Sequence, residues 1–146
     1  QTESSDLLDL RRSDINIFDL CSEAVENYTE NKIEILGDNK SFFHTDPYWL
    51  SVCLINLVEN AIRYGKDPIK ITIKTQIKYT LIQISDQGEI PFNNLKSILQ
   101  TKHIESKGLG LGLNIVQKTV KSLGGELSFT PNPTTFTIKL KRGDHA

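Results

Sequence analysis

The sequence lacks the features that mark several protein classes. No run of about eighteen apolar residues is present, so no membrane-spanning helix is predicted. Basic residues form no long run, and 17 Lys and Arg residues are balanced by 18 Asp and Glu residues. The composition therefore gives no electrostatic reason to expect a nucleic acid or a lipid surface as a partner.

Cysteine is scarce, and its placement is uninformative for chemistry. Cys21 and Cys53 lie far apart in the chain, each among apolar residues of a helical segment. They form no C-x-x-C pair and no metal-ligand spacing. We therefore expect two buried free thiols.

What remains is the composition of one globular domain. The chain has 146 residues, of which 38% are hydrophobic and 24% charged, which is enough to bury a core of its own. Its first residues, Gln-Thr-Glu-Ser-Ser, show neither an initiator methionine nor a signal-peptide profile. We expect an excised cytosolic fragment.

Two segments carry the functional signal. In the first, residues 56–64, the side chains of Asn56, Asn60 and Arg63 fall within about 60° of one another on a helix, which makes one polar stripe on an apolar helix. In the second, residues 108–116, three glycines at alternate positions precede an apolar helix pattern, so backbone N–H groups and a helix N-terminus can face an anion. Together the segments indicate a nucleotide phosphate site with a metal ligand, against the alternatives of a solvated helix face and a glycine-rich helix start without a ligand.

Two better-known glycine motifs do not fit. The third glycine of G-x-G-x-x-G would fall on Leu113, and no G-x-x-x-x-G-K-[ST] run exists. Neither a dinucleotide-binding fold nor a P-loop is predicted.

The periodicity predicts strands and helices in alternation. We expect three helices covering one face of a mixed, largely antiparallel sheet, which is a two-layer α+β arrangement. Residues 32–36 and 41–44 are expected to form a hairpin across the turn at 37–39, as are 69–75 with 80–85 and 126–130 with 134–140. The other expectations are a first strand at 14–18, helices capped by Asp19 and by Asp46 with Pro47, a short helix at 94–99, and a last helix at 109–123.

The motifs together resemble a known family. Asn-Leu-Val-Glu-Asn-Ala-Ile-Arg-Tyr at 56–64, Asp86-Gln-Gly88 and Gly-Leu-Gly-Leu-Gly-Leu at 108–113 are similar, in order and spacing, to the N, G1 and G2 boxes of the ATP-binding catalytic domain of bacterial two-component sensor histidine kinases. The resemblance covers nearly the whole chain and implies the Bergerat-type ATP-binding fold. It divides the chain into a remnant of a preceding dimerisation helix and linker (1–13), the catalytic domain (14–142) and a C-terminal tail (143–146).

The resemblance implies a role for each motif. Mg²⁺ is a hard ion that one neutral amide oxygen can hold when ATP supplies the negative charge, so Asn60 is the expected metal ligand. Asn56 and Arg63, the expected catalytic residues, would hold a metal-bound water and a phosphate. Asp86 would accept a hydrogen bond from the adenine amino group, with Thr134 helping through water and Thr135 as its competitor. The expected ATP contacts are Asn56, Asn60, Arg63, Tyr64, Asp86, Gly88, Lys102, Gly108, Leu109, Gly110, Leu111, Gly112, Leu113 and Thr134.

Lys102, together with His103 and Lys107, lies in a long connection that resembles the ATP lid of the family. Basic groups there would reach the terminal phosphates once nucleotide orders the loop. Solvated loop charge is the equal alternative for each residue.

The implied activity is transfer of the γ-phosphoryl group of Mg-ATP to a histidine of a separate dimerisation domain. None of His44, His103 and His145 lies in a phosphoacceptor-type sequence, so the accepting histidine is expected outside this chain. The implied partners are that histidine-bearing domain and a cognate response regulator, with no nucleic acid. The full-length protein is expected to be a homodimer and the fragment a monomer, in the cytoplasmic part of an inner-membrane sensor.

Three departures from the family pattern keep alternatives open. The G1 stretch is one residue short and lacks its second glycine, Leu95 and Ile98 stand where a Phe-x-x-Phe box is usual, and Pro133 replaces a glycine. A nucleotide-binding regulatory module or pseudokinase without efficient transfer is one alternative. A hydrolytic ATPase is the other, and it is disfavoured because the related hydrolases carry a glutamate where this chain has Asn56.

Overall fold

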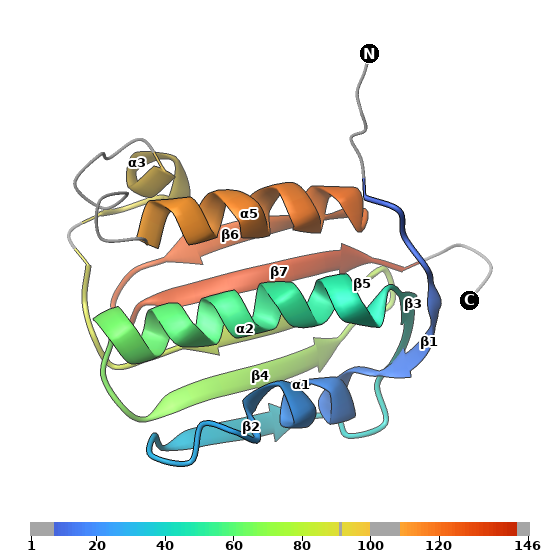
Figure 1. Ribbon diagram of the computed structural model, residues 1–146, viewed down its shortest axis with the longest axis horizontal. Coiled ribbons are helices and arrows are strands. Elements are labelled where there is room, and N and C mark those ends of the chain that lie inside the picture. Colours follow the sequence, from blue (N-terminus) through green and yellow to red (C-terminus); the bar gives the residue numbers. More distant parts are fainter. Residues whose placement is uncertain (1–7, 91, 100–108, 143–146) are drawn as a thin grey trace.

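The computed structural model describes residues 8–90, 92–99 and 109–142, and gives no side-chain detail for residues 109–111. One five-stranded sheet dominates it (Figure 1). The strand order is β2 (Ile33–Gly37), β4 (Ile69–Thr75), β5 (Tyr79–Ser85), β7 (Thr135–Lys141) and β6 (Gly125–Thr130). Only the β2–β4 pair is parallel, so the predicted mixed, mostly antiparallel sheet is confirmed.

The helices α1 (Ile17–Val25), α2 (Pro47–Tyr64) and α5 (Leu109–Ser122) all lie on one face of this sheet, with α2 between the other two (Figure 1). Strand alternation explains the choice of face, because Ile73, Ile82 and Ile138 are paired across three neighbouring strands and are buried. The short helix α3 (Leu95–Leu99) packs against α5. The predicted two-layer α+β fold is confirmed.

One predicted hairpin is wrong. Residues 41–44 do not pair with 32–36. Instead β3 (Phe42–Thr45) pairs antiparallel with β1 (Ser13–Asn16) in a separate two-stranded sheet. The strand β2 pairs in parallel with β4, which extends the main sheet and packs Ile33 and Ile35 against the core.

The start of α1 also differs from the prediction. Phe18 was expected in a strand and Asp19 as the helix cap, but the cap is Asn16, whose side-chain oxygen accepts from the Asp19 backbone N–H at 3.0 Å. The Asn16 amide also donates to the carbonyl of Asn39 at 2.9 Å, and Ile17 is fully buried. These tertiary contacts end the strand before Ile17.

Helix α2 forms as predicted. Asp46 caps it by accepting from the N–H groups of Tyr48 and Trp49 at 2.9 and 3.2 Å, and Pro47 occupies the first helical position. The other oxygen of Asp46 accepts from the Arg11 N–H at 2.7 Å, so the segment before β1 is tied to the start of α2. The helix ends at Tyr64.

The two thiols are buried and unpaired, as predicted. Cys21 and Cys53 belong to α1 and α2, and burial raises the pKa of each thiol to about 12. Within the described residues, no helix is long and apolar enough to cross a membrane.

Candidate functional site

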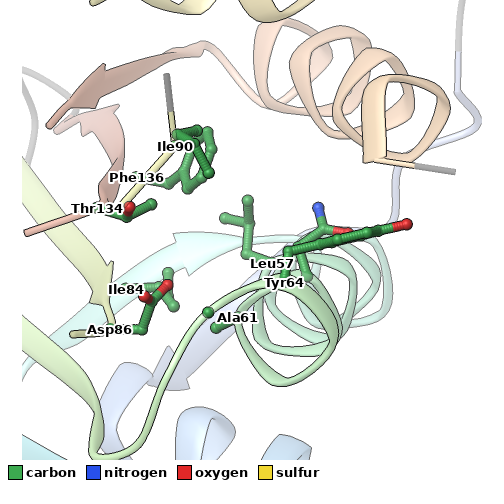
Figure 2. A pocket seen from close by; sticks show the side chains of 10 residues that line it. Leu57, Ala61, Tyr64, Ile84, Asp86, Ile90, Thr134 and Phe136 are labelled. Carbon is green, nitrogen blue, oxygen red and sulfur yellow. The ribbon is translucent and has the colours of Figure 1, made fainter. Parts of the chain in front are cut away.

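A pocket lies between the C-terminal half of α2, the end of β5 and the start of β7 (Figure 2). It holds about 350 Å³ of space open to solvent. Apolar walls with a few convergent polar groups are typical of small-molecule sites. The apolar lining is Leu57, Ala61, Ile84, Ile90 and Phe136, and the remainder is Asn60, Tyr64, Gly65, Asp86 and Thr134.

Asp86 follows directly on β5 and is only 4% exposed. Its Oδ1 accepts from the Gly88 N–H at 2.6 Å and from the Lys66 N–H at 3.4 Å. Burial raises the pKa of the Asp86 carboxyl, and these two N–H groups oppose the shift. Its Oδ2 has no hydrogen bond among the described residues, so this oxygen is available as an acceptor at the pocket.

Thr134 locks the segment after β5 to the segment before β7. Its hydroxyl donates to the Gly88 carbonyl at 3.0 Å, and its own carbonyl accepts from the Asp86 N–H at 3.1 Å. Of the two competing threonines, Thr134 lines the pocket, whereas the hydroxyl of Thr135 is exposed and donates to the Pro133 carbonyl.

The two asparagines of the polar stripe are half-buried and face the first turn of α5. A Cβ built on Gly112 would lie 3.7 Å from Oδ1 of Asn56 and 3.9 Å from Nδ2 of Asn60. Asn56 donates its Nδ2 to the carbonyl of Val52 at 2.9 Å, which leaves Oδ1 directed at α5. The two motifs that are fifty residues apart in the chain are therefore in contact.

Asn60 carries the least satisfied polar atom of the pocket. Its Nδ2 is buried and has no hydrogen-bond partner among the described residues. Buried polar groups are nearly always paired, so an unpaired amide beside an open pocket indicates a missing ligand. A neutral amide offers one oxygen to a cation and two N–H hydrogens to an anion, and the donor set therefore fits a magnesium nucleotide.

The remaining candidate residues lie outside the pocket lining, in the first turn of α5, or outside the described part of the chain. Arg63 is exposed and does not line the pocket, and Leu113 is fully buried in the core. Leu109, Gly110 and Leu111 form the first turn of α5, where backbone N–H groups have no partner within the helix. The residues that lie outside the described part of the chain are Lys102, His103, Lys107 and Gly108.

Sequence reasoning missed Gly65 and Lys66. Gly65 was not among the predicted site residues, but it forms part of the pocket beside Asp86. The Lys66 backbone N–H, rather than its side chain, contacts Asp86. No local pattern signals either contact.

Comparison with known proteins agrees with this geometry. The family model described as histidine kinase-, DNA gyrase B- and HSP90-like ATPase matches residues 45–144. The sensor histidine kinase VxrA of Vibrio cholerae is 36% identical over 93 residues, which cover 64% of this chain and 18% of VxrA.

Solved structures share the fold. The histidine kinase AdeS of Acinetobacter baumannii superposes with a TM-score of 0.78 at 20% identity, over 94% of this chain and 70% of AdeS. The catalytic domain of the histidine kinase ThkA superposes with a TM-score of 0.77 at 22% identity, over 90% of this chain and 98% of that domain. The chain thus spans under a fifth of VxrA and nearly all of one isolated catalytic domain.

Proposed function

Because this chain belongs to the family of histidine kinase-, DNA gyrase B- and HSP90-like ATPases, we propose that it is the ATP-binding catalytic domain of a two-component sensor kinase that phosphorylates a histidine. Membership of the family implies a Bergerat-type fold that binds ATP. The observation that carries the finer proposal is that one pocket holds both the buried Nδ2 of Asn60, which has no partner among the described residues, and Asp86, whose hydrogen bonds from described residues go to Oδ1 and not to Oδ2.

The adenine ring is proposed to occupy the apolar part of the pocket. Ile84 and Phe136 would contact its faces, because both line the cavity and neither has a polar atom to satisfy. Oδ2 of Asp86 would accept a hydrogen bond from the exocyclic amino group, and Thr134 would contribute through a bridging water. A charged acceptor in a buried site favours a base that carries an amino group at that position.

The phosphates are proposed to extend along the stripe toward α5. Asn60 would hold Mg²⁺ through its amide oxygen, and Asn56 would hold a water through Oδ1, which faces α5. The metal ion, when bound, neutralises charge on the phosphate oxygens. The free N–H groups at the start of α5 favour the same anions, and Arg63 and Lys102 are assigned to the outer phosphates.

Transfer to an imidazole is favoured over hydrolysis. The Asn56 amide cannot remove a proton from water, and its nitrogen already donates a hydrogen bond to the Val52 carbonyl. Glu59, one helical residue before Asn60, is exposed and accepts from the Tyr28 hydroxyl at 2.9 Å, so it is not a base at the pocket. In the proposed step an imidazole nitrogen bonds to the γ-phosphorus while the bond to the bridging oxygen breaks and ADP leaves.

The proposal extends to the context of the domain. Residues 14–142 are assigned to the catalytic domain, 1–13 to a linker from a dimerisation helix and 143–146 to a tail. The histidine-bearing dimerisation domain, a response regulator and an inner-membrane sensor with this domain on its cytoplasmic side are the expected partners and location. Homodimerisation would occur through the dimerisation domain, and this chain alone would be a monomer.

Two experiments test the proposal. ATP with Mg²⁺ should raise the melting temperature of the isolated chain, because a ligand that binds only the folded state stabilises it by mass action. When this chain is mixed with the histidine-bearing domain and labelled ATP, the label should then appear on that domain. No thermal shift at millimolar nucleotide would contradict ATP binding. A shift without labelling would favour the regulatory module, and phosphate release by this chain alone would favour a hydrolase.

A further inference from the structure

Gly65 lies against the carboxylate of Asp86. A Cβ built on Gly65 would lie 2.5 Å from Oδ1 of Asp86 and nearer still to Cγ and Oδ2. Every atom of the carboxylate thus occupies the space that any other residue at position 65 would need. Gly88 also packs closely here, because a Cβ there would lie 2.9 Å from the same Oδ1 and 3.1 Å from Cα of Gly65.

Backbone conformation does not explain the glycine at position 65. Its φ of −106° is open to any residue, and its N–H makes an ordinary helix-ending bond to the carbonyl of Ala61 at 2.9 Å. Gly124, by contrast, has a φ of +85° and nothing near its Cβ position. A glycine is therefore required at position 65 because a side chain there would overlap the Asp86 carboxylate.

We propose that Gly65 is a positioning residue for base recognition: by having no side chain, it lets the Asp86 carboxylate lie against the end of α2, with Oδ1 fixed by backbone N–H groups and Oδ2 directed at the base. This inference rests on the proposed binding of adenine at Asp86. It assigns a specificity role to a residue at the C-terminus of α2 rather than to the nucleotide-contacting residues themselves.

The geometry sets the size of the effect. A methyl group at position 65 would push the carboxylate away by about 1 Å, from 2.5 Å to an ordinary contact of 3.4 Å. A shift of that size breaks the hydrogen bond from Gly88, now 2.6 Å long, and displaces Oδ2 from the base. Since a hydrogen bond to a charged group contributes about 1.5 to 3 kcal/mol, ATP affinity should fall roughly tenfold to a hundredfold.

The first test measures Mg-ATP and Mg-GTP affinity by titration calorimetry for the wild type, Gly65→Ala and Gly125→Ala. Gly125 is the matched control, because a Cβ there would also meet an occupied position, the Lys139 carbonyl, but Gly125 belongs to β6, which contributes no residue to the pocket lining. Gly65→Ala should lose ATP affinity and most of its preference for ATP over GTP. Gly125→Ala should keep the wild-type ratio even if it melts earlier. An unchanged ratio in Gly65→Ala would overturn the inference.

A double-mutant cycle keeps the test decisive if Gly65→Ala is poorly folded. Asp86→Ala removes the atoms that a side chain at 65 would meet, so the melting temperature of Gly65→Ala with Asp86→Ala should match that of Asp86→Ala alone. If adding Gly65→Ala lowers the melting temperature equally in both backgrounds, Gly65 has a purely structural role.

The outcomes separate the inference from the function on which it rests. A wild-type chain that binds no ATP contradicts the proposed function. A wild-type chain that binds ATP, loses it on Asp86→Ala and keeps full affinity and selectivity on Gly65→Ala contradicts only the role of Gly65.

Discussion

Replacing Asn60 by alanine should stabilise the free protein while removing its response to Mg-ATP. The Nδ2 atom of Asn60 is buried without a partner, and such an atom costs about 1 kcal/mol in the folded state. Alanine is also the better helix former, by about 0.5 kcal/mol. Lost packing of the amide offsets part of this gain. A net gain of about 1 kcal/mol should raise the melting temperature of a chain of this size by about 2 to 4 °C.

The ligand effect should run in the opposite direction. At a hundred times its Kd, ATP adds about 2.7 kcal/mol to the stability of the wild type, or about 5 to 10 °C. Asn60→Ala should lose most of that shift. Differential scanning fluorimetry with and without nucleotide, in Mg²⁺ and in EDTA, measures both quantities.

Glu59→Ala is the control, since Glu59 is on the exposed side of the same helix and its carboxylate accepts from the Tyr28 hydroxyl, away from the pocket lining. It should keep the full nucleotide shift. An Asn60→Ala protein that melts several degrees below the wild type, or whose melting temperature still rises with nucleotide in a magnesium-dependent way, would refute the proposal that the unpaired Asn60 amide binds the ligand.

Three further predictions follow from the described contacts. Burial raises the pKa of Asp86, so the folded state binds a proton more readily than the unfolded chain, and the free energy of unfolding should fall as pH rises from the usual carboxyl range through the raised pKa. Asp86→Asn should abolish that decline, be the more stable form at neutral pH and bind ATP weakly; parallel urea-unfolding profiles of the two proteins across pH would contradict this. Thr134→Val should lower the free energy of unfolding by about 1 kcal/mol, since the Gly88 carbonyl loses its 3.0 Å bond, and denaturant melts of both proteins measure the difference. Asp46→Ala should cost about 1 to 2 kcal/mol by removing the cap of α2 and the acceptor for Arg11, whereas Asp46→Asn keeps one oxygen for the cap, loses only the acceptor for Arg11 and should cost less; equal melting temperatures for the two variants would count against the cap.

Local signals predicted the parts of the fold that depend on neighbours in the chain. Asp46 followed by Pro47 fixes the start of α2, and the spacing of Leu50, Leu54 and Leu57 fixes its buried face. These features need no knowledge of the rest of the chain, because capping and helical periodicity act within a few residues.

Strand partners were less predictable, because alternation defines the buried face of a strand but not its neighbour. Residues 41–44 follow a strong turn signal, so a hairpin with 32–36 was the natural prediction. The chain instead places β2 beside β4, where Ile33 and Ile35 gain contact with the core. The choice depends on packing across more than thirty residues, which no local pattern records.

The candidate site divides in the same way. The stripe that includes Asn56 and Asn60 was visible in the helix pattern, and Asp86 was identified from its motif. The role of Gly65 was not visible, because its reason lies in the carboxylate of Asp86, twenty-one residues further on, and appears only when α2 and β5 are packed together.

The carboxylate of Asp46 couples the segment before β1 mechanically to α2. It holds the backbone at Arg11 and the first turn of α2 at the same time, and α2 is an 18-residue rod, about 27 Å long, that carries Asn60 and Tyr64 near its far end. A displacement of the backbone just before β1 should therefore be transmitted to the N-terminal end of α2. One helix thus connects the backbone contact at Asp46 with the proposed ligand contacts at Asn60 and Tyr64.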